Sequence, residues 1–290
     1  MKTYDIVDSP DTSFPFVVEL GKLEGLFPEH THNYTELIVT LKGTGWQRSG
    51  GSRFPLKRGT VVTVPPPLAH QMEEMVDLTM YVLKFDLNRL ISFQYDLKND
   101  PGFRSLFIQC PPALYKGNSV PPLQLDEAQL HHVVGLMKVM DQEFQEQRPG
   151  YQVIIRTHLL ALTAYLSRCF LPQRTSLSLR MEKIIPTVVY MEENLHRTIR
   201  IQELAGLVYL SPRQYDRVFK EVYGVSPSHY LAQLRLNRAC QLMADASFPL
   251  GEIWERCGFT DNPFFYRQFK KEFGITPKQY RARLLSSMQK

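Results

Sequence analysis

The sequence has few cysteines and no long apolar run. Its cysteines, Cys110, Cys169, Cys240 and Cys257, are far apart, so they form neither a CxxC zinc motif nor the framework of a disulfide-rich domain. We therefore expect reduced thiols, as in cytoplasmic proteins. No run of eighteen apolar residues is present, and the first residues, MKTYDIVD, carry acids where a signal peptide is apolar. These absences predict a cytoplasmic protein without a membrane partner.

Signatures of common enzymes are also absent. We find no Ser-His-Asp or Cys-His pattern, no Walker loop and no GxGxxG after a strand. The 290 residues are 43% hydrophobic and 22% charged, which is ordinary for a globular chain with room for two or three domains. We therefore do not expect an enzyme.

The last third of the chain contains an internal repeat. Its copies span residues 201–230 and 250–280. They align with an offset of 50 residues downstream and 49 upstream, so one residue is inserted at the turn between the two helices. The matched residues are Arg217, Phe219, Lys220, Gly224, Pro227 and Tyr230 in the first copy, and Arg267, Phe269, Lys270, Gly274, Pro277 and Tyr280 in the second.

Each copy reads as helix, tight turn, helix, because apolar residues recur at helical spacing on both sides of a start signal. Ser211 and Gln214 predict a capping box at the start of the second helix of the first copy. In the second copy either Thr260 or Asp261 can cap the corresponding helix. The glycines expected at the ends of these helices are Gly224 and Gly274. The pattern predicts two helix-turn-helix units.

Positive charge is concentrated on this repeat. Residues 179–290 contain 17 Lys and Arg against 11 Asp and Glu, whereas residues 1–178 contain 17 against 18. Charge alone would fit a solvated helix face, but combined with two helix-turn-helix units it indicates a surface for a polyanion.

The repeat resembles the AraC/XylS family of bacterial transcription regulators. The resemblance rests on LSPRQYDRVFKEVYGVSPSHYLAQLRLNRACQLM and EIWERCGFTDNPFFYRQFKKEFGITPKQYR, and covers roughly the last hundred residues. It implies two helix-turn-helix units joined by a long helix, each placing its second helix in the major groove of double-stranded DNA. A helix over residues 228–244 would be about 25 Å long. With the widths of the flanking units added, it could place two helix-turn-helix units about one DNA turn apart.

The resemblance also implies which residues contact DNA. Arg217 and Arg267 are the strongest candidates, since an Arg can bond guanine in bidentate fashion or hold a phosphate. Lys220 and Lys270 lie one turn later and would reach phosphate. The full DNA-binding set is Arg213, Gln214, Asp216, Arg217 and Lys220 in the first unit, and Asn262, Pro263, Tyr266, Arg267 and Lys270 in the second. We expect the apolar side of the same helices, Tyr215, Phe219, Phe265 and Phe269, to be core.

Two residues depart from the family pattern. Tyr209 stands where the family has a turn glycine, which would cost about 1 kcal/mol if the backbone there is left-handed. Trp254 replaces a small residue on the first helix of the second unit, so it must find a pocket or spread the two helices.

The first hundred residues alternate apolar and polar residues in short runs separated by Gly and Pro clusters, which predicts an all-β barrel or jelly roll. Two segments, HTHNYTELIVTLKG and GTVVTVPPPLAH, resemble the two cupin motifs, with Pro67 and Glu74 as departures. The resemblance implies an N-terminal cupin-like sensor domain. The whole chain is therefore predicted to be an α+β multidomain protein.

The cupin motifs supply a candidate site. In metal cupins, His30, His32, Glu36 and His70 would converge on Zn, Mn or Fe. We expect no cofactor, with a divalent metal at these residues as the alternative, because regulators of this kind often keep the motif without metal. A small effector, such as a sugar, would instead use polar and aromatic side chains. These are His32, Tyr34, Glu36, Trp46, Arg48 and His70, although each taken alone could be core or solvated.

Helices are expected between the barrel and the repeat. One starts at the cap Asp126 and carries Val133, Met137 and Met140 on an apolar face, and a second follows from about Tyr151 to Phe170. We favour a homodimer interface over internal packing for this face. Pro186 marks the start of the next helix or a kink in it. The expected domains are a barrel over 1–110, a helical dimerisation segment over 111–170, a linker over 171–178 and a DNA-binding domain over 179–290, with helix-turn-helix units at about 201–223 and 250–273.

Together these features predict a DNA-binding transcription regulator, expected to be an activator, that is controlled by a small-molecule effector in the barrel. RNA polymerase is a further candidate partner. The alternative is a metal-dependent cupin enzyme, an isomerase or dioxygenase, with a helical C-terminal domain; it would leave the basic repeat unexplained.

Overall fold

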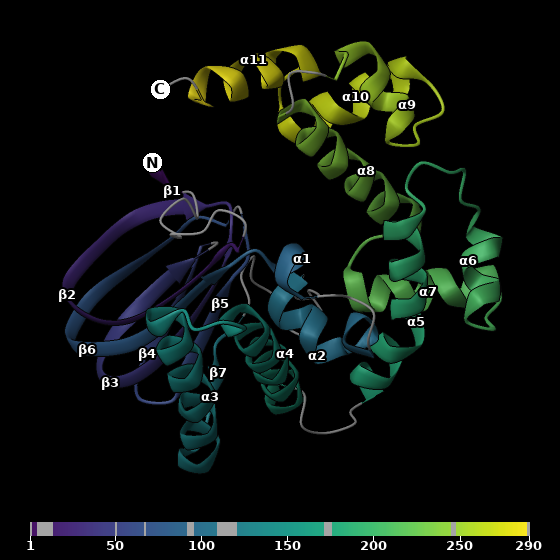
Figure 1. Ribbon diagram of the computed structural model, residues 1–290. Coiled ribbons are helices and arrows are strands. Elements are labelled where there is room, and N and C mark those ends of the chain that lie inside the picture. Colours follow the sequence, from purple (N-terminus) through teal and green to yellow (C-terminus); the bar gives the residue numbers. More distant parts are fainter. Residues whose placement is uncertain are drawn as a thin grey trace. The chain divides into compact units, whose positions relative to one another are not determined.

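The chain divides into two compact units. A computed structural model describes residues 2–4, 14–49, 51–66, 68–91, 96–108, 121–170, 176–244 and 248–288. The first unit is Met1–Leu179 and the second is Arg180–Lys290 (Figure 1). The predicted departure Pro67 and the thiol of Cys110 lie outside the described residues.

The first unit is built on one seven-stranded sheet with the order β1-β2-β6-β3-β5-β7, and β4 pairs with β3. All pairings are antiparallel except the parallel pair β1–β2. The long strands β2, β3 and β6 carry register shifts and curve strongly (Figure 1). The strands are β1 (Lys2–Tyr4), β2 (Phe16–His32), β3 (Thr35–Ser49), β4 (Ser52–Leu56), β5 (Thr60–Val64), β6 (His70–Phe85) and β7 (Leu123–Gln124).

The sheet buries side chains on two faces. One face, which we call the helix face, carries Leu37, Leu83 and Phe85 and packs against helices. The other, which we call the inner face, carries a separate cluster that includes Ile38, Val62 and Met80. Alternating residues of one strand thus enter two different cores.

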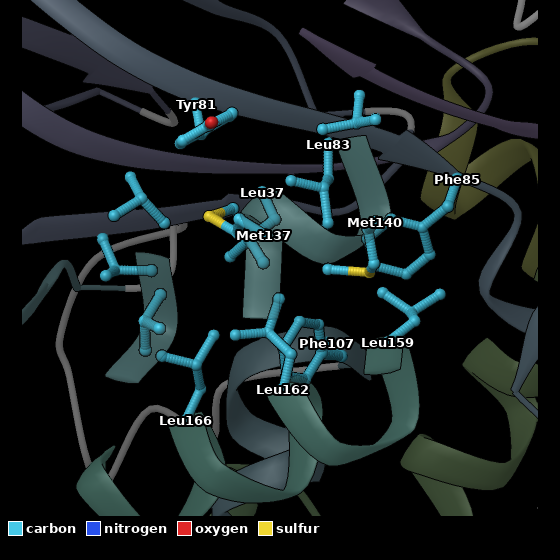
Figure 2. Packing of buried hydrophobic residues seen from close by; sticks show 14 of the residues in the cluster. Leu37, Tyr81, Leu83, Phe85, Phe107, Met137, Met140, Leu159, Leu162 and Leu166 are labelled. Carbon is cyan, nitrogen blue, oxygen red and sulfur yellow. The ribbon is translucent and has the colours of Figure 1, made fainter. Parts of the chain in front are cut away.

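Two long helices cover the helix face. The helices of this unit are α1 (Leu87–Leu90), η2 (Asp96–Asn99), α2 (Pro101–Phe103), η3 (Arg104–Ile108), α3 (Glu127–Glu146) and α4 (Tyr151–Phe170). The predicted cap Asp126 forms a full capping box with Gln129. By length and composition alone α4 could cross a membrane. One side of α4, including Leu159 and Leu162, is buried against the sheet and α3 (Figure 2).

This packing corrects the expected dimer surface. Val133, Met137 and Met140 are fully buried within the first unit, in the cluster on the helix face of the sheet. Figure 2 shows Met137 and Met140 in this cluster. An apolar stripe on a helix cannot distinguish internal packing from an interface by its pattern alone. For these three residues, internal packing rather than a dimer interface is what the structure shows.

The start of α3 is attached to the sheet through β7. Leu123 pairs with Val61, and the backbone N–H of Leu125 donates to the carbonyl of Gly59 at 2.9 Å. Arg58 holds Glu127 with two hydrogen bonds of 2.8 and 2.7 Å. The sheet therefore continues beyond the expected domain end at residue 110.

Helix α5 (Ser176–Glu193) leads into the second unit. It contains Pro186 in its interior, so the helix does not begin at that proline. It also begins at Ser176, so residues 176–178 of the expected linker are helical, and residues 171–175 of it lie outside the described residues. The hydroxyl of Tyr215 donates to Thr187 at 2.9 Å, and this bond ties α5 to the first helix-turn-helix unit.

The regular elements of the second unit are helices throughout its described residues. Its elements are α6 (Ile201–Leu207), α7 (Pro212–Tyr223), α8 (Pro227–Ala244), η4 (Leu250–Glu252), α9 (Ile253–Arg256), α10 (Asn262–Phe273) and α11 (Pro277–Met288). The helix-turn-helix pairs are α6–α7 and α9–α10, and the long helix α8 joins them (Figure 1). Tyr215, Phe219, Phe265 and Phe269 are fully buried, as predicted.

Candidate functional site

Helix α7 begins with the predicted capping box. The backbone N–H of Gln214 donates to Ser211 Oγ at 3.3 Å, and the Gln214 side-chain oxygen accepts from the Ser211 N–H at 3.1 Å. Gly224 ends the helix at φ 72°. The cap engages the oxygen of Gln214, so this side chain is less available to a base than the sequence suggested.

The exposed side of α7 carries the predicted cations. The Arg217 side chain is 73% exposed, and its Nε lies 3.9 Å from Glu221 Oε1. Lys220 Nζ lies 2.8 Å from Asp216 Oδ2, so each cation has an acid one turn away. Arg213 is also exposed. These acids reduce the net positive charge of the helix face.

Helix α10 presents the corresponding exposed face in the second helix-turn-helix unit. Asp261 is the cap, and its Oδ1 accepts from the Phe264 N–H at 2.7 Å. Arg267 and Lys270 are exposed. Asn262 Oδ1 is buried and has no hydrogen-bond partner among the described residues. The remaining predicted residues of this helix are Pro263, exposed, and Tyr266, half-buried.

The turns of the two helix-turn-helix units differ. Tyr209 adopts the left-handed conformation at φ 53° and is 95% exposed. Gly258 holds the equivalent position at φ 81°, and a Cβ there would lie 1.9 Å from the Leu195 carbonyl oxygen. Arg235 on α8 donates to the same carbonyl at 3.0 Å. No local pattern predicts this contact, because Leu195, Arg235 and Gly258 are far apart in the chain.

The Trp254 side chain packs against a hydrophobic core. It is half-buried and packs against the core of the second unit, which includes Ile253, Phe265 and Phe269. The substitution for a small residue is therefore accommodated within the core that holds α10.

In the first unit, His30, His32, Glu36 and His70 are buried together. His70 Nε2 lies 3.1 Å from Glu36 Oε2, and His32 Nε2 lies 3.8 Å from the same oxygen. Ligand atoms of His30, Glu36 and His70 all lie within 4.8 Å of one another. The cluster comes from the end of β2 and the starts of β3 and β6, which are neighbours in the sheet.

Burial governs the ionisation of this cluster. It lowers the pKa of His32 to about 4, and it also lowers the pKa of His30, with His70 adding to the effect. Burial by itself would raise the pKa of Glu36, but the hydrogen bond and charge of His70 bring that pKa below its ordinary value. These shifts favour an ionised Glu36 carboxylate beside neutral His30 and His32 side chains.

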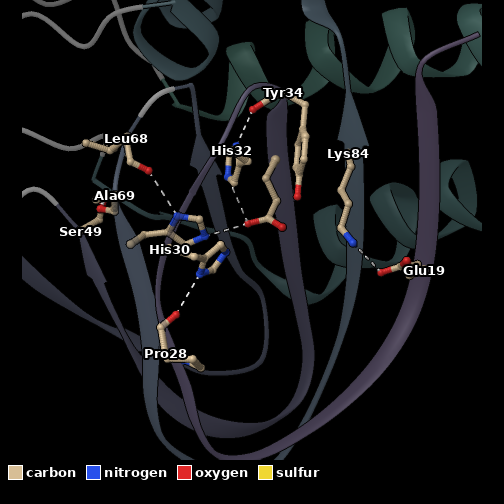
Figure 3. Close-up of polar contacts among 11 residues, drawn as sticks. Glu19, Pro28, His30, His32, Tyr34, Ser49, Leu68, Ala69 and Lys84 are labelled. Carbon is tan, nitrogen blue, oxygen red and sulfur yellow. Dashed lines mark hydrogen bonds and ion pairs between the residues drawn. The ribbon is translucent and has the colours of Figure 1, made fainter. Parts of the chain in front are cut away.

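The structure brings together only some of the predicted effector residues. Tyr34 is buried and stacks on His32 at 4.3 Å between ring centroids (Figure 3). Arg48 instead faces outward, where it bonds Glu73 at 3.1 Å, and Trp46 lies under the Arg53 guanidinium at 4.1 Å. The prediction that Trp46 and Arg48 line the pocket is therefore corrected.

Gln47 was missed. It is fully buried beside Met72 and Phe54 on the inner face, and neither amide atom has a hydrogen-bond partner among the described residues. Register shifts between Thr40 and Trp46 reverse which side chains point inward. Counting from Glu36 in steps of two therefore leads to the wrong face.

Comparisons with known proteins agree with this architecture. The family model for the AraC-like ligand binding domain matches residues 18–163, and a helix-turn-helix domain model matches residues 204–283. The HTH-type transcriptional activator RhaS of Enterobacter sp. (strain 638) is 24% identical over 284 residues, which cover 97% of this chain and 96% of RhaS. The HTH-type transcriptional regulator ArgR of Pseudomonas aeruginosa is 34% identical over 111 residues, 38% of this chain and 34% of ArgR.

Among solved structures, a transcriptional regulator from Chromobacterium violaceum with an AraC-type DNA-binding domain is 37% identical; the match covers 35% of this chain and 91% of that one, with a TM-score of 0.34. The matching families are regulators rather than enzymes, so the cupin-enzyme alternative is set aside. The ligand-binding and helix-turn-helix matches together place this chain in the AraC family of transcriptional regulators, which bind DNA under the control of an effector.

Proposed function

We propose that this regulator is an activator that reads a direct-repeat operator through α7 and α10 and responds to an effector on the inner face of its sensor sheet. The support for the DNA contacts is the pair of matched, exposed arginines, Arg217 and Arg267, on capped helices of equal length. Such a residue can supply about 1 to 3 kcal/mol of discrimination at one base pair.

The experiment is selection of DNA fragments by the full-length protein, followed by salt titration of the selected site. Arg217→Ala and Arg267→Ala should each cost about 1 to 3 kcal/mol, and each should relax specificity at its own half of the site. Lys138→Ala, on the exposed side of α3, removes the same charge as a control. Equal behaviour of all three variants would contradict the proposal.

For the effector, the single most informative residue is Gln47. Its amide can offer both a donor and an acceptor on the inner face, next to an apolar lining that includes Met72, Met75 and Met80. We propose a small molecule whose polar group pairs with this amide and whose remainder packs on the methionines. His32, Tyr34, Glu36 and His70 form the polar end of the same face.

Gln47→Met tests this assignment. Removing two unpaired buried polar atoms should leave stability unchanged or raised, since the substitution keeps the side-chain volume. The thermal shift produced by an active metabolite from cell extract should disappear in this variant. Retention of the full shift would show that the effector binds elsewhere.

The remaining assignments follow from family membership and are proposals of the same kind. We propose a homodimer in the cytoplasm that contacts RNA polymerase at the promoter. Sedimentation with and without operator DNA tests the dimer, and a reporter gene in a strain lacking the regulator tests activation. Higher reporter output without the regulator would identify a repressor instead.

A further inference from the structure

Helix α10 carries an exposed apolar side chain that the proposed DNA contacts do not use. Phe264 lies in the first turn of this helix, and 36% of the residue is exposed. Within the part of the chain that the structure describes, it is the only phenylalanine on the surface. A single exposed apolar residue is common on proteins, so its place on the helix decides whether it has a function.

Phe264 lies at the end of α10 that would contact base edges. In helix-turn-helix proteins, the N-terminal residues of the recognition helix make these contacts. Arg267, which is exposed, follows Phe264 by three residues, so the two side chains are neighbours on the helix surface. An arrangement that brings Arg267 to a base in the major groove therefore brings Phe264 to the groove as well.

The corresponding residue of α7 is Gln214, whose side chain caps its own helix. Its Oε1 accepts from the Ser211 backbone N–H at 3.1 Å and from the Ser211 hydroxyl at 2.9 Å. In α10 the cap is Asp261, whose Oδ1 accepts from the Phe264 N–H at 2.7 Å. This bond engages only the backbone of Phe264, so the ring is not needed to start the helix.

The turn before α10 holds the ring of Phe264 in place. The ring centroid lies 6.2 Å from that of Phe259, which is 5% exposed and belongs to the core formed by α8, α9 and α10. Aromatic rings at this separation attract each other. One part of the Phe264 ring is thus packed and another part is open before DNA binds, which lowers the entropy cost of a contact with DNA.

A phenyl ring has no hydrogen-bond donor or acceptor, so it can neither pair with the polar atoms of a base nor hold a phosphate. The apolar group that bases present in the major groove is the C5-methyl group of thymine. We infer that Phe264 is a specificity-determining residue that contacts a 5-methylpyrimidine in the half-site of α10. This inference rests on the proposed function, because it requires α10 to lie in the major groove. Helix α7 lacks this preference at the matching base, because Gln214 stands there.

The test replaces each thymine of the selected operator by uracil, one at a time. Uracil lacks only the methyl group and keeps every hydrogen-bonding group. We expect at least one uracil in the half-site of α10 to weaken binding of the full-length protein by about fourfold, the factor for one buried methyl group. Uracil at the matching base of the α7 half-site should have no effect. Where cytosine replaces the responsive thymine, its 5-methyl form should bind about fourfold more tightly than cytosine itself.

Variants assign this difference to one side chain. Phe264→Ala should bind the thymine and uracil operators equally, and Phe264→Met, which keeps an apolar side chain, should retain part of the difference. Leu207→Ala, which removes an exposed apolar side chain from α6, is the matched control and should keep the whole difference. If Phe264→Ala fails to fold, the wild-type uracil scan and Phe264→Met decide.

The inference is overturned if the half-site of α10 contains no thymine, if none of its thymines responds to uracil, or if Phe264→Ala keeps the wild-type difference. In each of these cases Arg267→Ala would still relax specificity at that half-site, so the proposed function would stand. Failure of the wild type to select any operator would instead overturn the proposed function and this inference together.

Discussion

The two helix-turn-helix units share a plan and differ at the turn. The first unit has Tyr209, a left-handed residue whose ring is almost fully solvated, and the second has Gly258, whose backbone touches the carbonyl of Leu195. The turn at Tyr209 therefore carries backbone strain and is exposed to solvent, whereas the turn at Gly258 is unstrained and packed against another segment. The repeat shows that one backbone conformation can be set by local chemistry in one copy and by a distant contact in the other.

The recognition helices differ in charge as well. Glu221 on α7 corresponds to Lys271 on α10, and Asp216 corresponds to Tyr266. The second helix is thus the more positive of the two. We expect it to contribute more nonspecific attraction to DNA, and the first helix to depend more on its specific contacts.

The largest expected effect is that of Gly258→Ala. A Cβ 1.9 Å from the Leu195 oxygen forces a shift, and alanine at φ 81° adds backbone strain. We expect a loss of about 3 kcal/mol or more in the free energy of unfolding. Urea unfolding followed by Trp254 fluorescence in a Trp46→Phe background measures it. Gly251→Ala, which has open space around its Cβ, should change little, and an equal loss there would remove the distinction.

The next effect is a loss of stability at alkaline pH that begins in the second unit. Burial raises the pKa of the Cys257 thiol to about 11 from an ordinary value near 9. Between these pH values the unfolded chain releases the proton and the folded chain keeps it, so stability falls as pH rises, by about 2 to 3 kcal/mol in total. Below pH 9 this contribution is fully present.

Trp254 fluorescence in urea at pH 8, 9, 10 and 11 measures this loss. Cys257→Ser should reduce the slope between pH 9 and 10. Burial also raises the pKa of Tyr215 in the first helix-turn-helix unit, but from an ordinary value near 10, so its effect begins at higher pH. A Cys257→Ser protein with an unchanged slope in that window would assign the loss to other groups.

Exchanging charge between the recognition helices should have a smaller effect. Glu221→Lys should strengthen DNA binding by about 1 kcal/mol and Lys271→Glu should weaken it by a similar amount, because each changes the attraction of an exposed helix face for phosphate. The slope of log affinity against log salt should become steeper in the first variant and shallower in the second. If both variants bind as the wild type does, this side of the helices lies away from the phosphates.

The smallest expected effect is a gain from Tyr209→Gly. Relief of the left-handed conformation is worth about 1 to 2 kcal/mol, and the added freedom of glycine in the unfolded chain offsets part of it. We expect a net gain of about 0.5 to 1 kcal/mol in urea unfolding. Tyr209→Ala loses the ring and keeps the strain, so it should be nearly neutral. A large loss in either variant would show that the exposed ring makes a contact.

The helix-turn-helix units could be predicted because their signals are local. Ser211 and Gln214 are three residues apart, and the core residues of α7 and α10 recur at helical spacing. Contacts between distant segments gave no such signal. The carbonyl of Leu195 restricts Gly258, and β7 joins β5 across a long stretch of chain.

The sensor site was predicted only in part, for a related reason. His30, His32, Glu36 and His70 were recognisable by spacing, and the structure gathers them. Side chains beyond Thr40 change face because of register shifts in β3, so Trp46 and Arg48 point away and Gln47 points inward. A β-bulge is not visible in an alternating pattern until the partner strand is known.

The attachment at β7 has a mechanical consequence for the sensor. Gly59, at φ 82°, leaves no room for a side chain because the Leu125 carbonyl oxygen would lie 2.6 Å from a Cβ, and Arg58 bonds Glu127 on the adjacent helical turn. The first turn of α3 is thus fastened to the start of β5, and Val64 at the other end of this strand pairs with Glu36. Any displacement of β5 by a molecule bound on the inner face must therefore move the first turn of α3 as well. The short strand β7 would transmit this movement from the binding face to the helices.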